Sequence, residues 1–311
     1  MARRRKSRFP VVLAVIIALA GVGLIGTAVY GTLGGKAQDL LSGNPLTSPS
    51  PEPPPPPPPP TLQAAAVTAP TVSTKLFAWA FYDRRTQKMT GSANSAKSVN
   101  FTESMLKVWL VSDYLRRLGT KQPSTTALKY TSTAIRNSND DSANWLYSRD
   151  GGRASITRLA RTCGLKSVKA AGLWSETTMT AQDAVRMGLC VADGRAAGPQ
   201  WTEYVLEEMR HVQGTTAAKD QEKRTGGGHW GIIDGLPENL QQEVSIKNGW
   251  TLHFSDGLWH VNCLAVHQDW VLAVQVQTKG VKVSAGQKDA AGLNNAASVC
   301  SAVAEQLTIT P

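Results

Sequence analysis

The sequence has few residues of the kinds that build metal centres or nucleic-acid surfaces. Its 311 residues include only five histidines, which are scattered, and four cysteines, no two of which have CxxC spacing. No metal or organic cofactor is therefore implied. Half of the net charge of +10 comes from five basic side chains in residues 1–8. The remainder is only mildly basic, so we expect no nucleic-acid partner.

Residues 9–33 lack charged side chains altogether. An apolar run of this length can span a bilayer, which needs about 20 residues. A cleaved signal peptide usually has a shorter apolar stretch, of about 7–15 residues. The sequence therefore favours a single-pass membrane anchor, with the basic arm of residues 1–8 in the cytoplasm and the rest outside. Cleavage, which would give a secreted protein, is the alternative. There is no cysteine near the end of the run, so the sequence does not support a lipid anchor.

Residues 34–75 are rich in Ser, Thr, Ala and Pro, and Pro53–Pro60 is an unbroken proline run. Eight prolines in the polyproline II conformation form a stiff rod of roughly 25 Å. We predict a disordered proline-rich spacer over 34–75, which holds a globular domain of residues 76–311 away from the membrane.

The four cysteines, Cys163, Cys190, Cys263 and Cys300, all lie in the outer part. An even number of cysteines in an oxidising compartment indicates disulfides, with three connectivities open. We predict Cys163–Cys190 and Cys263–Cys300, because each pair lies in elements expected to pack together. Four buried free thiols are the alternative.

The hydrophobic pattern predicts an α+β domain. Strand signals occur at 76–82, with a partner at 88–93, and again at 244–250, 259–266 and 271–277. Helical patterns occupy 102–118, which is apolar on most sides, and 140–147, 156–163, 180–191, 201–210 and 285–307. The first and last parts should share one antiparallel sheet, with a helical lobe between them.

The motif with the most chemistry is Ser104-Met105-Leu106-Lys107, at the start of the 102–118 helix. It places a hydroxyl and an amine three residues apart. A neutral Lys107 could take the proton of Ser104 and make it a nucleophile. The alternative is a first-turn serine beside a solvated lysine.

Two further motifs follow. Ser-Asn-Asp at 138–140 precedes a helix that carries Asn144, and Lys-Asn-Gly-Trp at 247–250 ends a strand. In this order and on these elements, the three motifs resemble those of the penicillin-recognising serine hydrolases, the superfamily of class A β-lactamases and D-Ala-D-Ala peptidases. The resemblance spans about 76–308 and is closest to an actinobacterial serine-hydrolase-like group. It implies a β-lactamase/transpeptidase-like fold, with an antiparallel sheet flanked by a helical lobe and terminal helices.

The resemblance also implies roles. Ser104 would form an acyl-enzyme, Lys107 would be its base and Ser138 would pass a proton to the leaving nitrogen. The backbone amides of Ser104 and Trp250 would form the oxyanion hole. The implied partner is a β-lactam or a peptidoglycan stem peptide, bound by a monomer. The implied substrate-binding residues are Asp140, Asn144, Lys247, Asn248, Gly249 and Trp250.

Several positions depart from the superfamily pattern. Asn139-Asp140 inverts the usual Asp-Asn order, and an ionised Asp140 cannot donate a hydrogen bond to a substrate. Asn248 replaces a threonine that contacts the substrate carboxylate. Ser138 lies only 34 residues after Ser104, about half the class A spacing, so part of the helical lobe is missing.

The stretch before residue 180 lacks the Glu-x-x-Leu-Asn pattern that activates the deacylating water in class A enzymes. Glu176 is the only acid there that could substitute. We therefore expect slow deacylation. The competing interpretation is a catalytically degenerate module that binds the cell wall or a protein, in which Ser138 merely caps a helix and Lys247 is an ordinary edge-strand charge.

Overall fold

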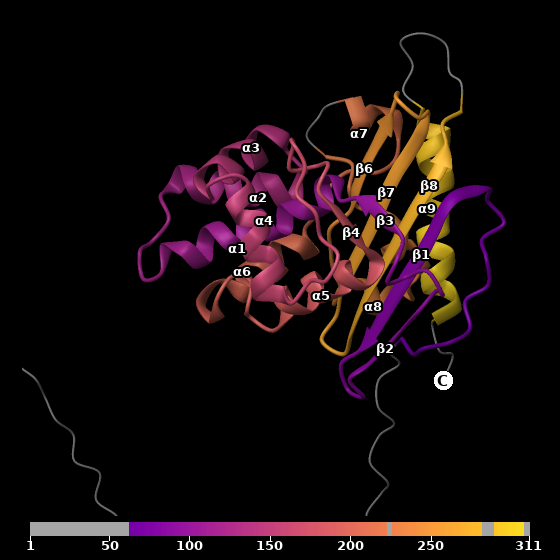
Figure 1. The fold of residues 1–311 in the computed structure, drawn as a ribbon, viewed down its shortest axis with the longest axis horizontal. Coiled ribbons are helices and arrows are strands. Elements are labelled where there is room, and N and C mark those ends of the chain that lie inside the picture. The colour runs from indigo at the N-terminus through magenta and orange to yellow at the C-terminus, as the bar shows by residue number, and fades with distance from the viewer. Residues whose placement is uncertain (1–61, 223–225, 282–288, 308–311) are drawn as a thin grey trace, which may run out of the picture. The chain divides into compact units, whose positions relative to one another are not determined.

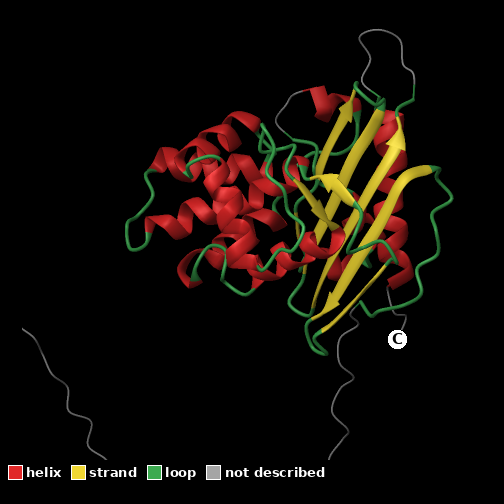
Figure 2. Ribbon diagram, in the orientation of Figure 1, coloured by secondary structure: helices red, strands yellow, loops and turns green. Residues whose placement is uncertain are grey.

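The computed structural model describes residues 62–222, 226–281 and 289–307. A helical lobe lies beside a sheet, and helix α9 packs behind the sheet (Figures 1 and 2). The predicted basic arm, the membrane anchor and most of the spacer fall in residues 1–61, outside the described part. Among the described helices, none is long and apolar enough to cross a bilayer.

The main sheet is antiparallel and joins the two ends of the domain, as the sequence predicts. Its order is β2-β1-β8-β7-β5, and β6 also pairs with β7. The strands are β1 (Thr74–Asp83), β2 (Lys88–Gly91), β5 (Ser245–Ile246), β6 (Gly249–His253), β7 (Leu258–Val266) and β8 (Trp270–Lys279).

Helices cover both faces of this sheet. Side chains alternate along β7, so Cys263 faces α9 (Ala290–Leu307) while Leu264 faces α5 (Ala181–Ala192). At Gly188 of α5, an added Cβ would lie 2.7 Å from a methyl of Val271 and 3.1 Å from one of Leu264. Glycine therefore allows α5 to pack directly on the strands.

The helical lobe is built around the buried helix α1 (Lys107–Leu118). A second, two-stranded sheet joins β3 to β4 beside it. The remaining elements are β3 (Val99–Phe101), η1 (Glu103–Leu106), α2 (Thr125–Arg136), α3 (Asp140–Arg149), α4 (Arg153–Cys163), β4 (Thr178–Thr180), α6 (Pro199–Arg210), α7 (Ala218–Glu222), η2 (Gly231–Gly235) and α8 (Glu238–Gln241).

Both predicted disulfides are confirmed. Cys163 at the end of α4 is bonded to Cys190 in α5, and Cys263 in β7 is bonded to Cys300 in α9. The first bond ties two helices of the lobe together, and the second fastens α9 to the sheet.

The domain begins earlier than the predicted boundary at Leu76. Leu62 is 1% exposed, and the Gln63 amide donates to the Leu307 carbonyl at 3.1 Å. Thr68 donates to the side chain of Gln306 through its amide and its hydroxyl. Residues 62–73 therefore run along α9, so the assignment of the spacer to 34–75 is wrong for its described end. A composition rich in small and polar residues concealed these contacts.

Two further element boundaries differ from the prediction and bear on the site. The predicted strand 244–250 is two strands, β5 and β6, with Lys247 and Asn248 between them. The predicted helix 102–118 opens as the 3-10 turn η1, which contains Ser104, and becomes α-helical at Lys107.

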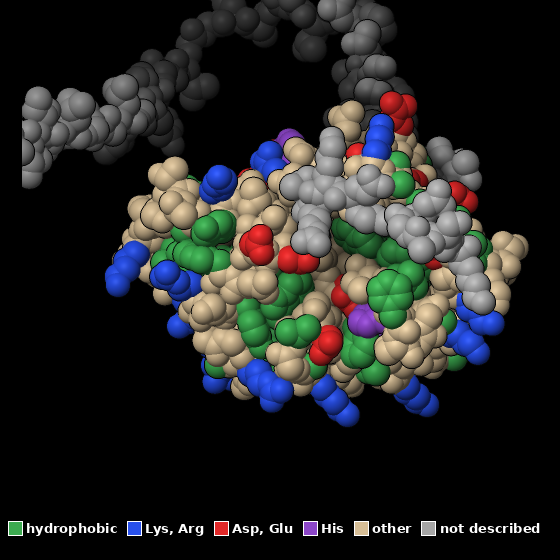
Figure 3. Space-filling view, turned by 90° about the horizontal axis from the view of Figure 1, so that it is seen from above, with side chains coloured by type: hydrophobic (Ala, Val, Ile, Leu, Met, Phe, Trp, Pro, Cys, Tyr) green, Lys and Arg blue, Asp and Glu red, His purple; other side chains and the backbone are tan. Residues whose placement is uncertain are grey.

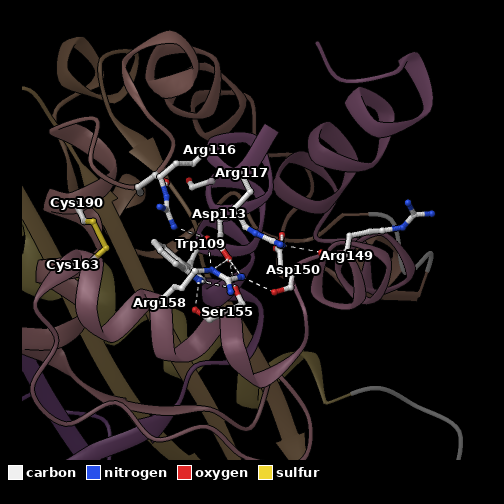
Figure 4. Close-up of polar contacts among 12 residues, drawn as sticks. Trp109, Asp113, Arg116, Arg117, Arg149, Asp150, Ser155, Arg158, Cys163 and Cys190 are labelled. Carbon is white, nitrogen blue, oxygen red and sulfur yellow. Dashed lines mark hydrogen bonds and ion pairs between the residues drawn. A yellow bond between two sulfur atoms is a disulfide. The ribbon is translucent and has the colours of Figure 1, made fainter. Parts of the chain in front are cut away.

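A buried carboxylate joins the helices of the lobe (Figure 4). Asp113 of α1 is fully buried and accepts from Arg158 of α4 at 2.5 Å, Ser155 at 2.8 Å and Arg116 at 2.7 Å. The indole of Trp109 donates to Ser155 at 3.0 Å. Several charge-assisted hydrogen bonds thus compensate the desolvation of this carboxylate and fix α4 against α1.

Candidate active site

Ser104 lies in η1, a turn held from both sides. The amides of Thr102 and Glu103 donate to the carbonyls of Thr177 and Ser175, at 2.7 and 2.8 Å. The next residue, Met105, is fully buried. The turn is therefore anchored in the core while the Ser104 side chain lines a cleft.

Lys107 is fully buried, and its ammonium nitrogen lies 2.8 Å from Ser104 Oγ. It also contacts the carbonyl oxygen of Ser138. Burial lowers the pKa of Lys107 below its ordinary value, although the Asp140 carboxylate opposes this shift. A lysine with a lowered pKa beside a serine hydroxyl can accept the serine proton. The interpretation of Lys107 as a solvated charge is wrong.

Ser138 lies between two lysines. Its Oγ is 3.0 Å from Lys247 Nζ and 3.4 Å from Lys107 Nζ. Its φ of +52° is unusual for a residue other than glycine. The cap of helix α3 is the next residue, Asn139, whose Oδ1 accepts from the Ser142 amide at 2.8 Å. Ser138 is therefore not the helix cap.

Lys247 lies at the junction of β5 and β6 and is fully buried. Its Nζ donates to Ser138 Oγ and to the Asn248 carbonyl, both at 3.0 Å. Burial, reinforced by the nearby charge of Lys107, holds the pKa of Lys247 well below its ordinary value. The residue is part of the buried network and not a solvated edge-strand charge.

Residues from all three motifs meet in one place. A chain of contacts runs from Ser104 Oγ to Lys107 Nζ, on to Ser138 Oγ, and from there to Lys247 Nζ. Ser104 and Ser138 line a cleft of about 640 Å³ between the lobe and the sheet, whereas both lysines are fully buried. Figure 3 shows this face from above, with acidic side chains around a hollow. The cleft is lined by residues that include Ser104, Ser138, Asp140, Asn144, Trp174 and Trp250.

Strand β6 passes directly against the nucleophile turn at Gly249. A Cβ at this position would lie 2.5 Å from both the Met105 nitrogen and the Thr102 carbonyl oxygen, and 2.8 Å from the Ser104 nitrogen. Only glycine fits such an approach. This approach brings Gly249, the residue before Trp250, against the Ser104 amide.

Asp140 joins the network through the ion pair with Lys107, at 2.6 Å from Oδ1 to Nζ. Its side chain is 74% exposed and borders the cleft. The carboxylate favours the charged form of Lys107, whereas burial favours the neutral form.

Two of the predicted substrate-binding side chains form hydrogen bonds within the protein itself. The Asn248 side chain donates to the carbonyls of Gly228 and Trp230, at 2.9 and 2.7 Å, and is 1% exposed, so it does not face the cleft. Asn144 borders the cleft but accepts a hydrogen bond from the Trp174 indole at 2.8 Å. Glu176 does not line the cleft.

Sequence reasoning missed Trp174. This side chain is 6% exposed, and its ring centre lies 5.1 Å from Lys107 Nζ. An indole face close to an ammonium group is a favourable cation–π arrangement. The only sequence signal was an aromatic residue in a loop of small and polar residues.

The chain matches no protein-family model. Solved structures similar to it include a β-lactamase from Streptosporangium roseum, with a TM-score of 0.53 and 15% identity over 75% of this chain and 91% of that one. PBP-A gives a TM-score of 0.53 and 13% identity over 74% of this chain and 89% of that one. A class A β-lactamase from Mycobacterium abscessus gives 0.51 and 14%, over 73% and 92%.

The chain has the class A β-lactamase fold. The predicted fold class is thereby confirmed, together with its antiparallel sheet and helical lobe. Identities of 13–15% establish the fold alone.

Proteins named "Putative lipoprotein LppW" in Mycobacterium bovis and Mycobacterium tuberculosis are 26% identical in sequence to this chain over 188 residues. The match covers 59% of this chain and 56% of theirs, so it spans only about half of the relatives' length.

Proposed function

We propose that this protein is a serine hydrolase of the β-lactamase/penicillin-binding type, which forms an acyl-enzyme at Ser104. Its substrate would be a β-lactam or a peptide that resembles the D-Ala-D-Ala end of a peptidoglycan stem. The observation that carries this proposal is the convergence of Ser104, Lys107, Ser138 and Lys247 at hydrogen-bond distances, with both serines lining one cleft.

In the proposed reaction, neutral Lys107 takes the proton of Ser104 Oγ, and Oγ attacks the substrate carbonyl. The carbonyl oxygen becomes an oxyanion and is bound by the amides of Ser104 and Trp250. As the intermediate collapses, the carbonyl–nitrogen bond breaks. Ser138 passes its hydroxyl proton to the leaving nitrogen and takes in return, from Lys107 at 3.4 Å, the proton that came from Ser104. Lys247, 3.0 Å from Ser138 Oγ, holds that hydroxyl in place.

We infer that the acyl-enzyme is hydrolysed slowly. Beside Lys107 the cleft wall is formed by the indole of Trp174, which cannot accept a proton from water. Of the three described carboxylates that line the cleft, those of Glu103, Asp140 and Asp141, two are engaged: that of Asp140 is paired with Lys107, and that of Glu103 is bonded to Thr251 and His253. Neither is a free base of the kind that activates water.

A fluorescent penicillin tests this function. Wild-type protein should become covalently labelled, and Ser104→Ala should remain unlabelled while keeping its circular dichroism spectrum. Turnover of nitrocefin at the rate of ordinary β-lactamases would contradict slow deacylation. Absence of label on the wild type would contradict the acyl-enzyme itself.

A second candidate function is a catalytically degenerate module that binds cell-wall material or a protein through the same cleft. The observation in its favour is the 2.6 Å ion pair between Asp140 and Lys107, because a charged lysine cannot accept the Ser104 proton. Binding of a stem peptide without covalent labelling of Ser104 would favour this alternative.

We further propose that the domain is held outside the cytoplasmic membrane by residues 9–33. The support is the uncharged apolar run and the word lipoprotein in the name of the LppW relatives. Cell fractionation and sequencing of the mature N-terminus test the proposal. A soluble protein whose N-terminus follows residue 33 would show cleavage.

A further inference from the structure

Glu103, the residue before the proposed nucleophile, has an unusual backbone and an unusual burial. Its φ is +48°, in the left-handed region that side chains other than glycine rarely occupy. Its side chain is only 5% exposed. Strained residues of this kind persist where the surrounding structure holds them, and they occur preferentially at functional sites. The contacts of Glu103 show what holds it.

The Glu103 carboxylate bridges to strand β6 with both of its oxygens. Oε2 accepts from the Thr251 hydroxyl at 2.7 Å, and Oε1 lies 2.7 Å from His253 Nε2. Both partners follow closely after Trp250, whose amide is the second proposed oxyanion donor. One side chain therefore connects the two segments that supply the two donors.

These two segments touch through their backbones alone at Gly249. The hypothetical Cβ there would lie 2.8 Å from the Ser104 nitrogen. Since no side chain fits at this contact, a small shift of β6 would change the position of the Trp250 amide relative to that of Ser104. Loss of one oxyanion donor typically costs about 10²–10³ in rate, so the spacing of the two amides matters to acylation.

His253 is itself supported by further contacts. Its ring centre lies 5.1 Å from that of Phe101 and 4.5 Å from that of His260. His260 is bonded to Asn100 at 2.9 Å and to Asp256 at 2.8 Å. The bridge from Glu103 thus ends on a packed cluster and not on a mobile surface side chain.

We propose that Glu103 is a positioning residue: its carboxylate holds β6 against the nucleophile turn and so sets the spacing of the Ser104 and Trp250 amides. The proposal rests on the acyl-enzyme function. Because Thr251 and His253 each engage one of its oxygens, we assign Glu103 a positioning role and not one in proton transfer. It acts through the two amides.

The test compares variants within the full chain. His253→Leu removes one end of the bridge without touching the cleft, since His253 does not line it. His253→Gln, which keeps an N–H donor, is the matched control. Glu103→Ala removes the whole bridge. Glu103→Gln keeps an acceptor for Thr251, and the imidazole of His253 can change tautomer to accept from the new amide.

The first readout is acylation by a penicillin at several concentrations. Glu103→Ala and His253→Leu should lower the limiting acylation rate at least 10-fold, with a half-saturating concentration within about threefold of wild type. The two conservative variants should stay within about threefold of the wild-type rate. A purely structural role would instead lower the fraction of active protein and leave the rate of the remainder unchanged. That result, or wild-type rates in Glu103→Ala, would overturn the proposal.

The second readout does not depend on catalysis. Amide hydrogen exchange in residues 103–106 and 249–252 should be faster in Glu103→Ala and His253→Leu than in wild type, and unchanged in helix α9. If wild-type protein is not acylated, the proposed function fails, and this exchange decides the role of Glu103 by itself. Unchanged exchange at both segments would show that Glu103 does not hold them together.

Discussion

Replacing Asp150 with asparagine should stabilise the protein at neutral pH and leave it nearly unchanged near pH 4. Asp150 follows helix α3 and is fully buried. Its Oδ2 has no hydrogen-bond partner among the described residues, and its Oδ1 lies 3.5 Å from Arg117 (Figure 4). Burial raises the pKa of Asp150 from 3.8 to about 8, and the charge of the buried Asp113 adds to this shift.

The sign of the pH dependence follows from this raised pKa. Below about pH 4 the carboxyl is protonated in both the folded and the unfolded chain, so it does not oppose folding. Between pH 4 and 8 the unfolded chain loses the proton and the folded chain keeps it, so the free energy of unfolding falls as pH rises. At pH 7.5 the cost is on the order of 5 kcal/mol, at 1.36 kcal/mol per pKa unit.

Asparagine has the shape of the protonated acid and carries no ionisable group. We expect Asp150→Asn to raise the free energy of unfolding by several kcal/mol at pH 7.5 and by less than about 1 kcal/mol at pH 4. Urea titrations of both proteins, followed by tryptophan fluorescence at pH 4, 6 and 7.5, measure this difference. A difference that is independent of pH, or a destabilised variant at pH 7.5, would refute the reasoning.

Three further predictions concern the site and its scaffold. The acylation rate should rise with pH through the pKa of Lys107, which burial places below 10.5; a rate that is flat between pH 5 and 9 and survives Lys107→Met would exclude this base. Trp174→Ala should shorten the lifetime of the penicillin adduct at least severalfold, because it admits water beside Lys107; intact-mass time courses measure this, and a longer-lived adduct would argue against a water-excluding indole. Replacing Cys163 and Cys190 with alanine removes a bond that closes a 27-residue separation. The double replacement should lower the free energy of unfolding by about 3.5 kcal/mol in urea titrations. An unchanged free energy of unfolding would contradict a stabilising role of this disulfide.

Much of the scaffold was predictable because local patterns specify it. The buried helix after Ser104 is apolar on most sides, and the strands at either end of the domain are β-branched and aromatic, so they could be assigned to one core. Helix α2 was not predicted, because its buried residues, Ala127, Thr131, Ala134 and Ile135, are mostly small. The packing of residues 62–73 on α9 was also missed, since it depends on contacts distant in sequence.

The site was predictable where chemistry and spacing coincide, as at Ser104 and Lys107. It was not predictable where a side chain is redirected by tertiary contacts. Asn248 looked like a substrate ligand, yet the loop at 228–230 takes both of its donors. Nothing in the sequence singled out Glu103, because its bridge to β6 joins residues about 150 positions apart.

Intact-mass spectrometry after incubation with benzylpenicillin shows whether Ser104 is an acylated nucleophile. We predict one persistent adduct with the full mass of the β-lactam, located on the peptide that contains Ser104 and absent from Ser104→Ala. Unmodified wild-type protein beside unreacted penicillin, or an adduct that remains in Ser104→Ala, would contradict this prediction.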